Sequence, residues 1–354
     1  MNNEVTKLKK ESFGNTAKGE EASLYIMTNK NGMQLAVSDY GATLVSLFVP
    51  DRNNELVDVV LGFGDVRDYE MGGKNFYGAT IGRNANRIGH ARFSLNGKAY
   101  QLENNNNGSN LHSGFHYYNQ RMWQVRSKSE TSITLTLHSP NGDQGYPGAL
   151  DMEVTYTVTK DNGIQIEYFS TPNEDTVINM TNHSYFNLNG HDWGTILDQG
   201  VWIDASYYTR TDSQLIPTGE LVEVEGTPMD FNEMKLLGRD IDLPYEALDF
   251  GQGYDQNWAL NNCGMFSKVA EMQADHRGIL MEVYTDRPGM QLYTGNFLDG
   301  TDVGKENVVY QRRSGVCFET QFFPDAVNQE HFKGPICKAG DVYRTKTMYK
   351  FMVV

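Results

Sequence analysis

The chain has 354 residues, enough for one large β domain or two ordinary domains, and its formal net charge of −15 leaves no basic surface for nucleic acid. The same charge argues against anionic membrane surfaces, and no run of about 18 apolar residues predicts a membrane span. The N-terminus lacks an apolar secretion signal and the three cysteines form no disulfide framework, so we expect a cytoplasmic protein with reduced thiols.

Along the chain, the first predicted element is a helix of one or two turns at residues 65–71. Short alternating segments rich in β-branched and aromatic residues then dominate and predict strands. The clearest of these cover residues 133–138, 152–158, 164–170, 279–285 and 342–351. Asn-Gly turns at residues 140–143 and 161–163 separate the first three strands, which indicates hairpins. A second short helix is predicted at residues 231–237.

The order of these elements favours one fold class. Strands follow strands without alternating helices, so a parallel α/β sheet is disfavoured. We expect an all-β fold, a large antiparallel β-sandwich with few short helices. The sequence has no Pro/Ser-rich linker, charged tail or convincing internal repeat, and the four asparagines at 104–107 lead into a glycine as a loop. We therefore expect residues 1–354 to form a single domain.

Two histidines four residues apart, His112 and His116, could suggest a metal site. The intervening glycine disfavours a regular helix, and no cysteine or carboxylate stands nearby at ligand spacing. The sequence also lacks a phosphate-binding glycine loop and a dinucleotide fingerprint. We therefore expect neither a metal nor a cofactor.

Residues 177–188 place several amide and hydroxyl side chains around one imidazole, that of His183. The polar residues are Asn179, Thr181, Asn182, Ser184 and Asn187. A lone histidine is commonly a hydrogen-bonded core residue, and that interpretation stays open. A sugar, however, needs a donor or acceptor for each hydroxyl, and histidine can change its protonation near neutral pH. The segment is therefore a candidate sugar site.

Glu319 lies in the middle of a predicted strand at residues 316–322. Alternation places Cys317 and Glu319 on one face of this strand, where a buried carboxylate is costly without partners. One interpretation is that this face meets solvent. The apolar sequel at 322–326 instead favours a lined cavity. Cys317 could pair with His183 as an activated thiol, but a buried structural thiol is the more common role.

These segments together resemble the aldose 1-epimerase (galactose mutarotase) family. The matching segments cover nearly the whole chain in the family's order, at residues 41–47, 78–88, 96–102, 110–112, 179–188, 254–257, 288–296 and 315–325. Any one of them would be weak evidence, whereas eight in order are strong. The resemblance implies an antiparallel β supersandwich and interconversion of the α and β anomers of free aldoses such as galactose and glucose.

The resemblance also implies roles for individual residues. Glu319 is expected to be the general base and His183 the general acid. The residues expected to bind the sugar are Asn86, Arg87, His112, Tyr185, Asp255 and Gln291. Two positions depart from the family's pattern: Gln256 stands where the family usually has histidine, and Ser113 where it usually has glycine. These departures put the local loop shape and the sugar preference in doubt more than the reaction.

The expected chemistry needs one deprotonated and one protonated group at the same pH. Ring opening removes the proton of the C1 hydroxyl and protonates the ring oxygen, so we expect a carboxylate and an imidazolium. An alternative function is a hexose-6-phosphate 1-epimerase, which would need a cationic pocket that the sequence does not display. A non-catalytic carbohydrate-binding protein is another, but it would not need both His183 and Glu319. We expect a small-molecule aldose as the partner and a monomer or homodimer.

Overall fold

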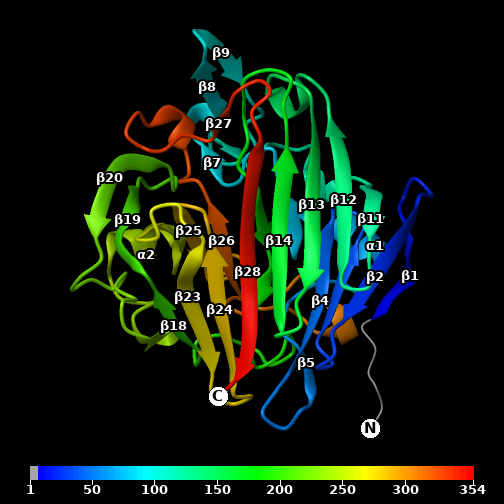
Figure 1. Cartoon of the computed structure of the whole chain (residues 1–354). Coiled ribbons are helices and arrows are strands. Elements are labelled where there is room, and N and C mark those ends of the chain that lie inside the picture. The colour runs from blue at the N-terminus through cyan, green and yellow to red at the C-terminus, as the bar shows by residue number, and fades with distance from the viewer. Residues whose placement is uncertain (1–6) are drawn as a thin grey trace.

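The computed structural model of the chain describes residues 7–354, and three antiparallel sheets dominate it. The largest lies at the centre of Figure 1 and has the C-terminal strand in its middle. In spatial order its described strands are β11 (Gln124–Lys128), β12 (Ser132–Ser139), β13 (Leu150–Val158), β14 (Gly163–Ser170), β28 (Tyr343–Val353), β24 (Ile279–Thr285), β23 (Ser267–Ala274), β18 (Gly200–Ile203) and β21 (Lys235–Leu236). All five strands and both hairpin turns predicted above are confirmed in this sheet.

A second sheet carries the candidate catalytic carboxylate. Its described strands are, in spatial order, β17 (Tyr185–Phe186), β26 (Val316–Gln321), β25 (Gly289–Tyr293), β22 (Asp255–Leu260), β19 (Ala205–Thr211) and β20 (Pro217–Glu223). The N-terminal sheet follows chain order through β1 (Lys7–Asn15), β2 (Glu21–Thr28), β3 (Gln34–Ser38), β4 (Thr43–Pro50) and β5 (Leu56–Asp58).

Four short strand pairs complete the described architecture. They are β6 (Ala79–Ile81) with β16 (Thr181–His183), β7 (Arg87–Ile88) with β10 (Asn110–Leu111), β8 (Arg92–Leu95) with β9 (Lys98–Gln101), and β15 (Thr176–Val177) with β27 (Ile336–Cys337). Two of these pairs place candidate site residues, because β16 ends at His183 and β7 begins at Arg87.

One hydrophobic core joins the sheets. Met152 and Val283 of the largest sheet are fully buried and belong to the same cluster as Leu292 and Phe318 of the second sheet. The two layers are also linked by a hydrogen bond, because the Tyr349 hydroxyl donates to the carbonyl of Phe318 (2.8 Å). The expected all-β antiparallel sandwich is confirmed, and the second sheet is packed against the largest one.

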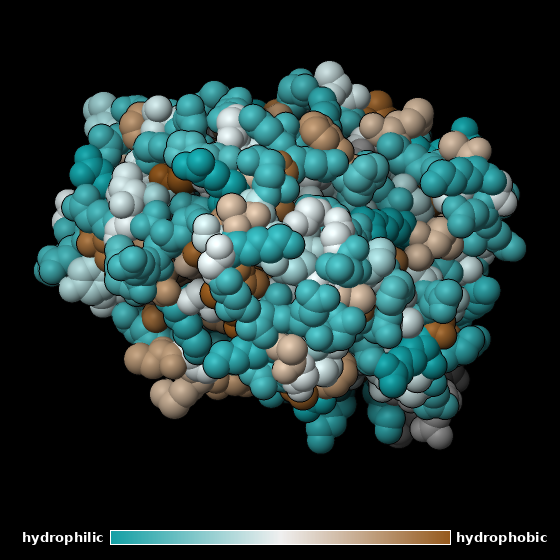
Figure 2. Space-filling model, turned by 90° about the horizontal axis from the view of Figure 1, so that it is seen from above, coloured by the Kyte–Doolittle hydropathy of each residue, from teal (hydrophilic) through white to brown (hydrophobic). Residues whose placement is uncertain are grey.

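The two α-helices are short, as expected. The helix α1 (Val66–Met71) confirms the first prediction, and it begins where the Asp65 carboxylate accepts a hydrogen bond from the backbone N–H of Arg67 (2.8 Å). The helix α2 (Glu246–Gly251) was not predicted. Over residues 7–354, no helix is both long and apolar enough to cross a membrane. The face of the molecule in Figure 2 is largely hydrophilic, with scattered apolar residues.

The helix predicted at residues 231–237 is wrong. This segment bends and then forms the short strand β21, followed by a 3₁₀ turn. Phe231 is buried against Trp258 with ring centroids 5.8 Å apart. Lys235 is also buried, and its ammonium donates to Asp240 (2.8 Å) and to the carbonyl of Pro228 (2.6 Å). These tertiary contacts override the weak helical pattern that the sequence displays.

Candidate active site

A pocket of about 510 Å³ lies over one face of the second sheet and is lined by all eight residues that the family resemblance assigned to the site. The other polar residues predicted around the imidazole do not line it: Asn179, Thr181, Asn182, Ser184 and Asn187. Its polar lining includes Asn86, Arg87, Asn106, Asn107, His112, His183, Ser213, Gln214, Asp255, Gln291 and Glu319. A larger hollow of about 800 Å³ lies elsewhere; five of its fourteen described lining residues are acidic and none is a histidine. The candidate acid and base therefore lie together in the smaller pocket.

The sheet itself positions three of the carboxylate and amide side chains. Glu319 on β26 is the direct cross-strand partner of Gln291 on β25, and Asp255 on β22 lies opposite Tyr293 of β25. All six residues of β26 are buried, so the interpretation that one face of this strand meets solvent is wrong. The Gln291 amide donates to Asp255 Oδ1 (2.7 Å), which fixes both side chains.

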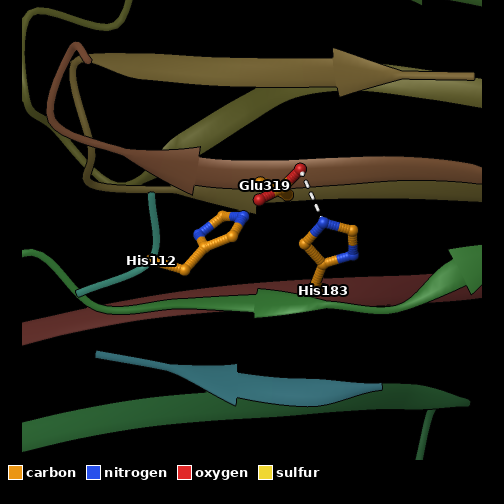
Figure 3. A group of neighbouring side chains, drawn as sticks. All are labelled: His112, His183 and Glu319. Carbon is orange, nitrogen blue, oxygen red and sulfur yellow. Dashed lines mark ion pairs between the residues drawn. The ribbon is translucent and has the colours of Figure 1, made fainter. Parts of the chain in front are cut away.

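His183 faces this sheet from the short strand β16, which pairs with β6. Its Nε2 atom lies 3.5 Å from Oε1 of Glu319, as the dashed line in Figure 3 marks. Both side chains are at least 95% buried. Tyr185 packs behind the imidazole with ring centroids 5.0 Å apart. The structure thus brings the two candidate catalytic residues into contact.

His112 projects into the pocket from the loop that follows β10. Its Nδ1 atom accepts a hydrogen bond from the backbone N–H of Asn86 (3.1 Å), so a neutral ring carries its hydrogen on Nε2. In Figure 3 this ring is directed toward Glu319. Asn86 in turn accepts from the backbone N–H of Arg87 through its side-chain oxygen (2.9 Å). The loop and β7 therefore form one hydrogen-bonded unit beside the acid–base pair.

Arg87 and Asp255 form a loose ion pair at the other side of the pocket. Arg87 Nη2 lies 3.9 Å from Asp255 Oδ2, and Arg87 Nε donates to Asn106 (3.3 Å). Burial raises the pKa of Asp255, and this rise is opposed by Arg87 and by the hydrogen bond from Gln291. At a separation of 3.9 Å the guanidinium can still donate a hydrogen bond to a further oxygen atom.

Burial controls the protonation of the acid–base pair. It raises the pKa of Glu319 well above its usual range; Asp255 raises it further and Arg87 opposes the shift. Burial lowers the pKa of His183 to about 4, with a small opposing effect from the residue's own backbone. The expected imidazolium is therefore not the resting form at neutral pH, because the pocket disfavours a charge on the ring.

Two oxygen atoms in the pocket lack a hydrogen-bond partner among the described residues. They are Oε2 of Glu319 and Oε1 of Gln291, both fully buried. Buried polar atoms normally have a partner, and an unpartnered one next to a pocket indicates a ligand or water position. Both residues line the pocket, so either oxygen could accept a hydrogen bond from a ligand once its side chain turns toward the cavity.

The structure brings together a different set of possible metal ligands from the pair of histidines that the sequence suggested. His116 is exposed and pairs with Glu103, so it does not join His112. Ligand atoms of His112, His183 and Glu319 instead lie within 4.8 Å of one another, a spacing at which a cation could bind. The expectation that the protein binds no metal therefore stays a prediction.

The two positions that depart from the family's pattern have structural partners. The Gln256 amide group donates to the carbonyl of Ala247 on α2, and its oxygen accepts from the backbone N–H of Asp255 (2.9 Å). The Ser113 hydroxyl accepts from the backbone N–H of Asn84 (2.7 Å). Gln256 therefore links β22 to α2, Ser113 holds the loop that carries His112, and neither residue lines the pocket.

Several lining residues were not predicted. The aromatic ones are Phe76, Phe250, Tyr293 and Phe297. Phe76 contacts His112 edge to face with centroids 4.8 Å apart, and Phe297 stacks near Tyr293. Aromatic residues are common in any core, so no local pattern distinguished these. The asparagine run at 104–107 was recognised as a loop, but its contribution of Asn106 and Asn107 to the pocket was not.

Solved structures share this architecture. A crystal structure of an aldose epimerase homologue from C. elegans superposes with a TM-score of 0.86 at 29% sequence identity, covering 94% of this chain and 99% of that one. The fold and the paired histidine and glutamate thus define a mutarotase-like β-sandwich protein.

Sequence comparison gives the family. Galactose mutarotase from Sus scrofa is 37% identical over 342 residues, 96% of this chain and 97% of the relative. Aldose 1-epimerase from Haemophilus influenzae is 36% identical over 341 residues, 95% and 98% of the two chains. The family model for aldose 1-epimerase matches residues 23–350. The chain belongs to the aldose 1-epimerase family, which confirms the resemblance found in the sequence.

Proposed function

We propose that this protein is an aldose 1-epimerase that interconverts the α and β anomers of free aldoses such as galactose and glucose. The observation that carries the proposal is the contact between His183 and Glu319 inside a pocket of sugar-compatible polar groups. Membership of the family supports the same reaction class.

In the proposed reaction Glu319 is the base and His183 the acid. The carboxylate takes the proton of the C1 hydroxyl while the imidazolium gives a proton to the ring oxygen, and the C1–ring oxygen bond breaks. Rotation about C1–C2 presents the other face of the aldehyde, and closure reverses both transfers. The pair ends the ring-opening step as a carboxylic acid and a neutral imidazole, so no proton is exchanged with solvent.

The buried environment suits both transfers. Burial raises the pKa of Glu319 and lowers that of His183, so the carboxylate is a stronger base and the imidazolium a stronger acid than in water. The ionised and neutral forms of the pair differ only in the position of one proton. A bound sugar can shift that proton between the two groups without placing a net charge in the pocket.

The remaining polar residues would bind the sugar hydroxyls. We assign Asn86, Arg87, His112, Asp255 and Gln291 to this role because they line the pocket around the acid–base pair. Tyr185, whose ring lies against His183, would form part of the wall. Positioning by several such groups is what allows a reaction that is slow in water to proceed without a cofactor.

Polarimetry tests the proposed activity. Freshly dissolved α-glucose and α-galactose should reach anomeric equilibrium faster with the protein, at a rate proportional to its concentration. A rate equal to that of buffer for a panel of aldoses would refute the proposal. Calorimetric sugar binding without any rate increase would instead identify a carbohydrate-binding protein.

A phosphorylated substrate is the competing possibility. Lys74 and Arg87 are the only Lys or Arg side chains in the described pocket lining. Each lies near a carboxylate, at 3.7 Å from Asp299 and 3.9 Å from Asp255 respectively. The neighbouring carboxylates repel a phosphate dianion, so we expect glucose to be turned over faster than glucose 6-phosphate.

A further inference from the structure

The strand β26 contacts both ring nitrogens of His183. Glu319 lies 3.5 Å from Nε2, and the thiol sulfur of Cys317 lies 3.4 Å from Nδ1. Residues 317 and 319 project from the same face of the strand because strand side chains alternate. The imidazole of His183 therefore spans two neighbouring side chains of one buried strand.

Among the described side chains the thiol is the polar contact at Nδ1, and the residue's own backbone also interacts with the ring. Cys317 is fully buried, and His183 is 4% exposed. The other neighbours of the imidazole contact it as aromatic rings, those of Phe76, His112, Tyr185 and Tyr293. Burial, with a contribution from Glu319, raises the pKa of Cys317 well above its usual value, so the sulfur keeps its hydrogen. A neutral thiol is available to the ring at all moderate pH values.

We propose that Cys317 is a positioning residue that holds the imidazole of His183 through Nδ1, with Nε2 directed at Glu319 and the sugar. This inference rests on the proposed mutarotation, in which His183 alternates between neutral and protonated forms. A thiol can donate to a bare Nδ1 and can also accept weakly from a protonated one. The ring therefore keeps its partner and its orientation throughout the cycle.

The thiol is a weak hydrogen-bonding partner, and this weakness suits the role. A carboxylate at Nδ1 would stabilise the imidazolium strongly and make it a poorer acid. A thiol fixes the ring with little stabilisation of the charged form. His183 thus remains oriented while retaining the strong acidity that protonation of a ring oxygen requires.

Kinetics of three variants test the proposal. Loss of this weak hydrogen bond, and with it of the fixed ring orientation, in Cys317→Ala should lower kcat about fivefold and change KM by less than about twofold. Cys317→Ser restores a group that donates and accepts, so kcat should recover to within about twofold of the unmodified protein. Cys337→Ala removes a buried thiol outside the pocket and is the matched control, with unchanged kcat. Thermal unfolding confirms that each variant is folded.

Nitrogen-15 NMR of the histidine rings supplies a readout that a purely structural thiol would not move. In the sugar-free protein, Cys317→Ala should shift the Nδ1 resonance of His183, while Cys317→Ser and Cys337→Ala should not. The proposal is overturned if Cys317→Ala leaves the ring resonances unchanged, if it shifts them without loss of kcat, or if folded Cys317→Ser behaves like Cys317→Ala. Absence of mutarotation in the unmodified protein would refute the proposed function instead, and the ring resonances would still decide whether Cys317 holds His183.

Discussion

The rings of His112 and His183 meet edge to face, with centroids 5.5 Å apart and an interplanar angle of 83°. Their nitrogens have different partners, since Nδ1 of His112 accepts a backbone hydrogen bond from Asn86 while Nε2 of His183 faces Glu319. Burial, together with the neighbouring His183 and Arg87, lowers the pKa of His112 well below its usual value. His112 is therefore a fixed neutral donor, distinct in role from His183.

His112→Asn tests this assignment. Asparagine can accept the Asn86 N–H through its side-chain oxygen, and it tolerates the positive φ of 51° at this position, so the loop should persist. The variant loses the Nε2 donor, and kcat/KM should fall about tenfold because one hydrogen bond of about 1–1.5 kcal/mol is removed. Polarimetry over a range of sugar concentrations measures the change, and an unaltered kcat/KM would exclude a contact between His112 and the sugar.

Glu319→Gln should separate catalysis from stability. The substitution keeps the shape of the side chain but removes the base, so kcat should fall by roughly 10²–10⁴-fold. Calorimetric sugar binding should change little. Because Glu319 is a buried carboxyl with one unpartnered oxygen, the melting temperature should stay equal or rise. Glu167→Gln, on the half-buried face of β14, is the control and should retain full activity. Full activity of Glu319→Gln would remove Glu319 from the mechanism.

The sequence predicts individual strands better than it predicts how distant segments pack together. Alternation identified the strands of the largest sheet because one of their faces is consistently buried, as in β13. The segment at 231–237 failed because Phe231 packs on Trp258 and Lys235 pairs with Val201 of β18, both of which are distant in the chain. Local polar patterning drew attention to His183 and Glu319, but the family resemblance was needed to assign their roles.

The protonation states of the site residues could not be predicted from the sequence. An imidazolium was expected from the reaction alone, yet the pKa of His183 depends on its nearly complete burial beneath distant strands and loops. The contact between Cys317 and His183 likewise requires the register of β26 against β17 and the position of β16. These are long-range properties, which a one-dimensional pattern does not encode.

Stability should fall in acid partly because His183 resists protonation. Its folded-state pKa of about 4 lies below the ordinary value of 6.5, so between these values the unfolded chain binds a proton that the folded protein does not. The folded state therefore loses about 3 kcal/mol from this residue as the pH falls from about 7 to about 4. Urea unfolding at several pH values measures this loss.

The non-titrating variant His183→Asn isolates that contribution from those of other groups. It should lose less stability than the unmodified protein over the same pH range, because position 183 then binds no proton in either state. Identical pH dependence in the two proteins would show that the folded-state pKa of the ring equals its unfolded-state value.

Ser113 offers a final test, which concerns the loop that carries His112. Its φ of 74° lies in the left-handed region, where a side chain costs about 1 kcal/mol relative to glycine. Its hydroxyl accepts from the backbone N–H of Asn84 (2.7 Å) and donates to the carbonyl of the same residue (3.1 Å). Strain and hydrogen bonding therefore oppose each other at one residue.

The two simplest substitutions separate these effects. Ser113→Gly relieves the strain and loses the hydrogen bonds, so the free energy of unfolding should change by less than about 1 kcal/mol. Ser113→Ala keeps the strain and loses the same bonds, and it should destabilise the protein by about 2 kcal/mol. Urea unfolding of both variants measures the two changes in the free energy of unfolding. Equal destabilisation by glycine and alanine would mean that the positive φ carries no cost, and that the hydroxyl alone fixes this loop.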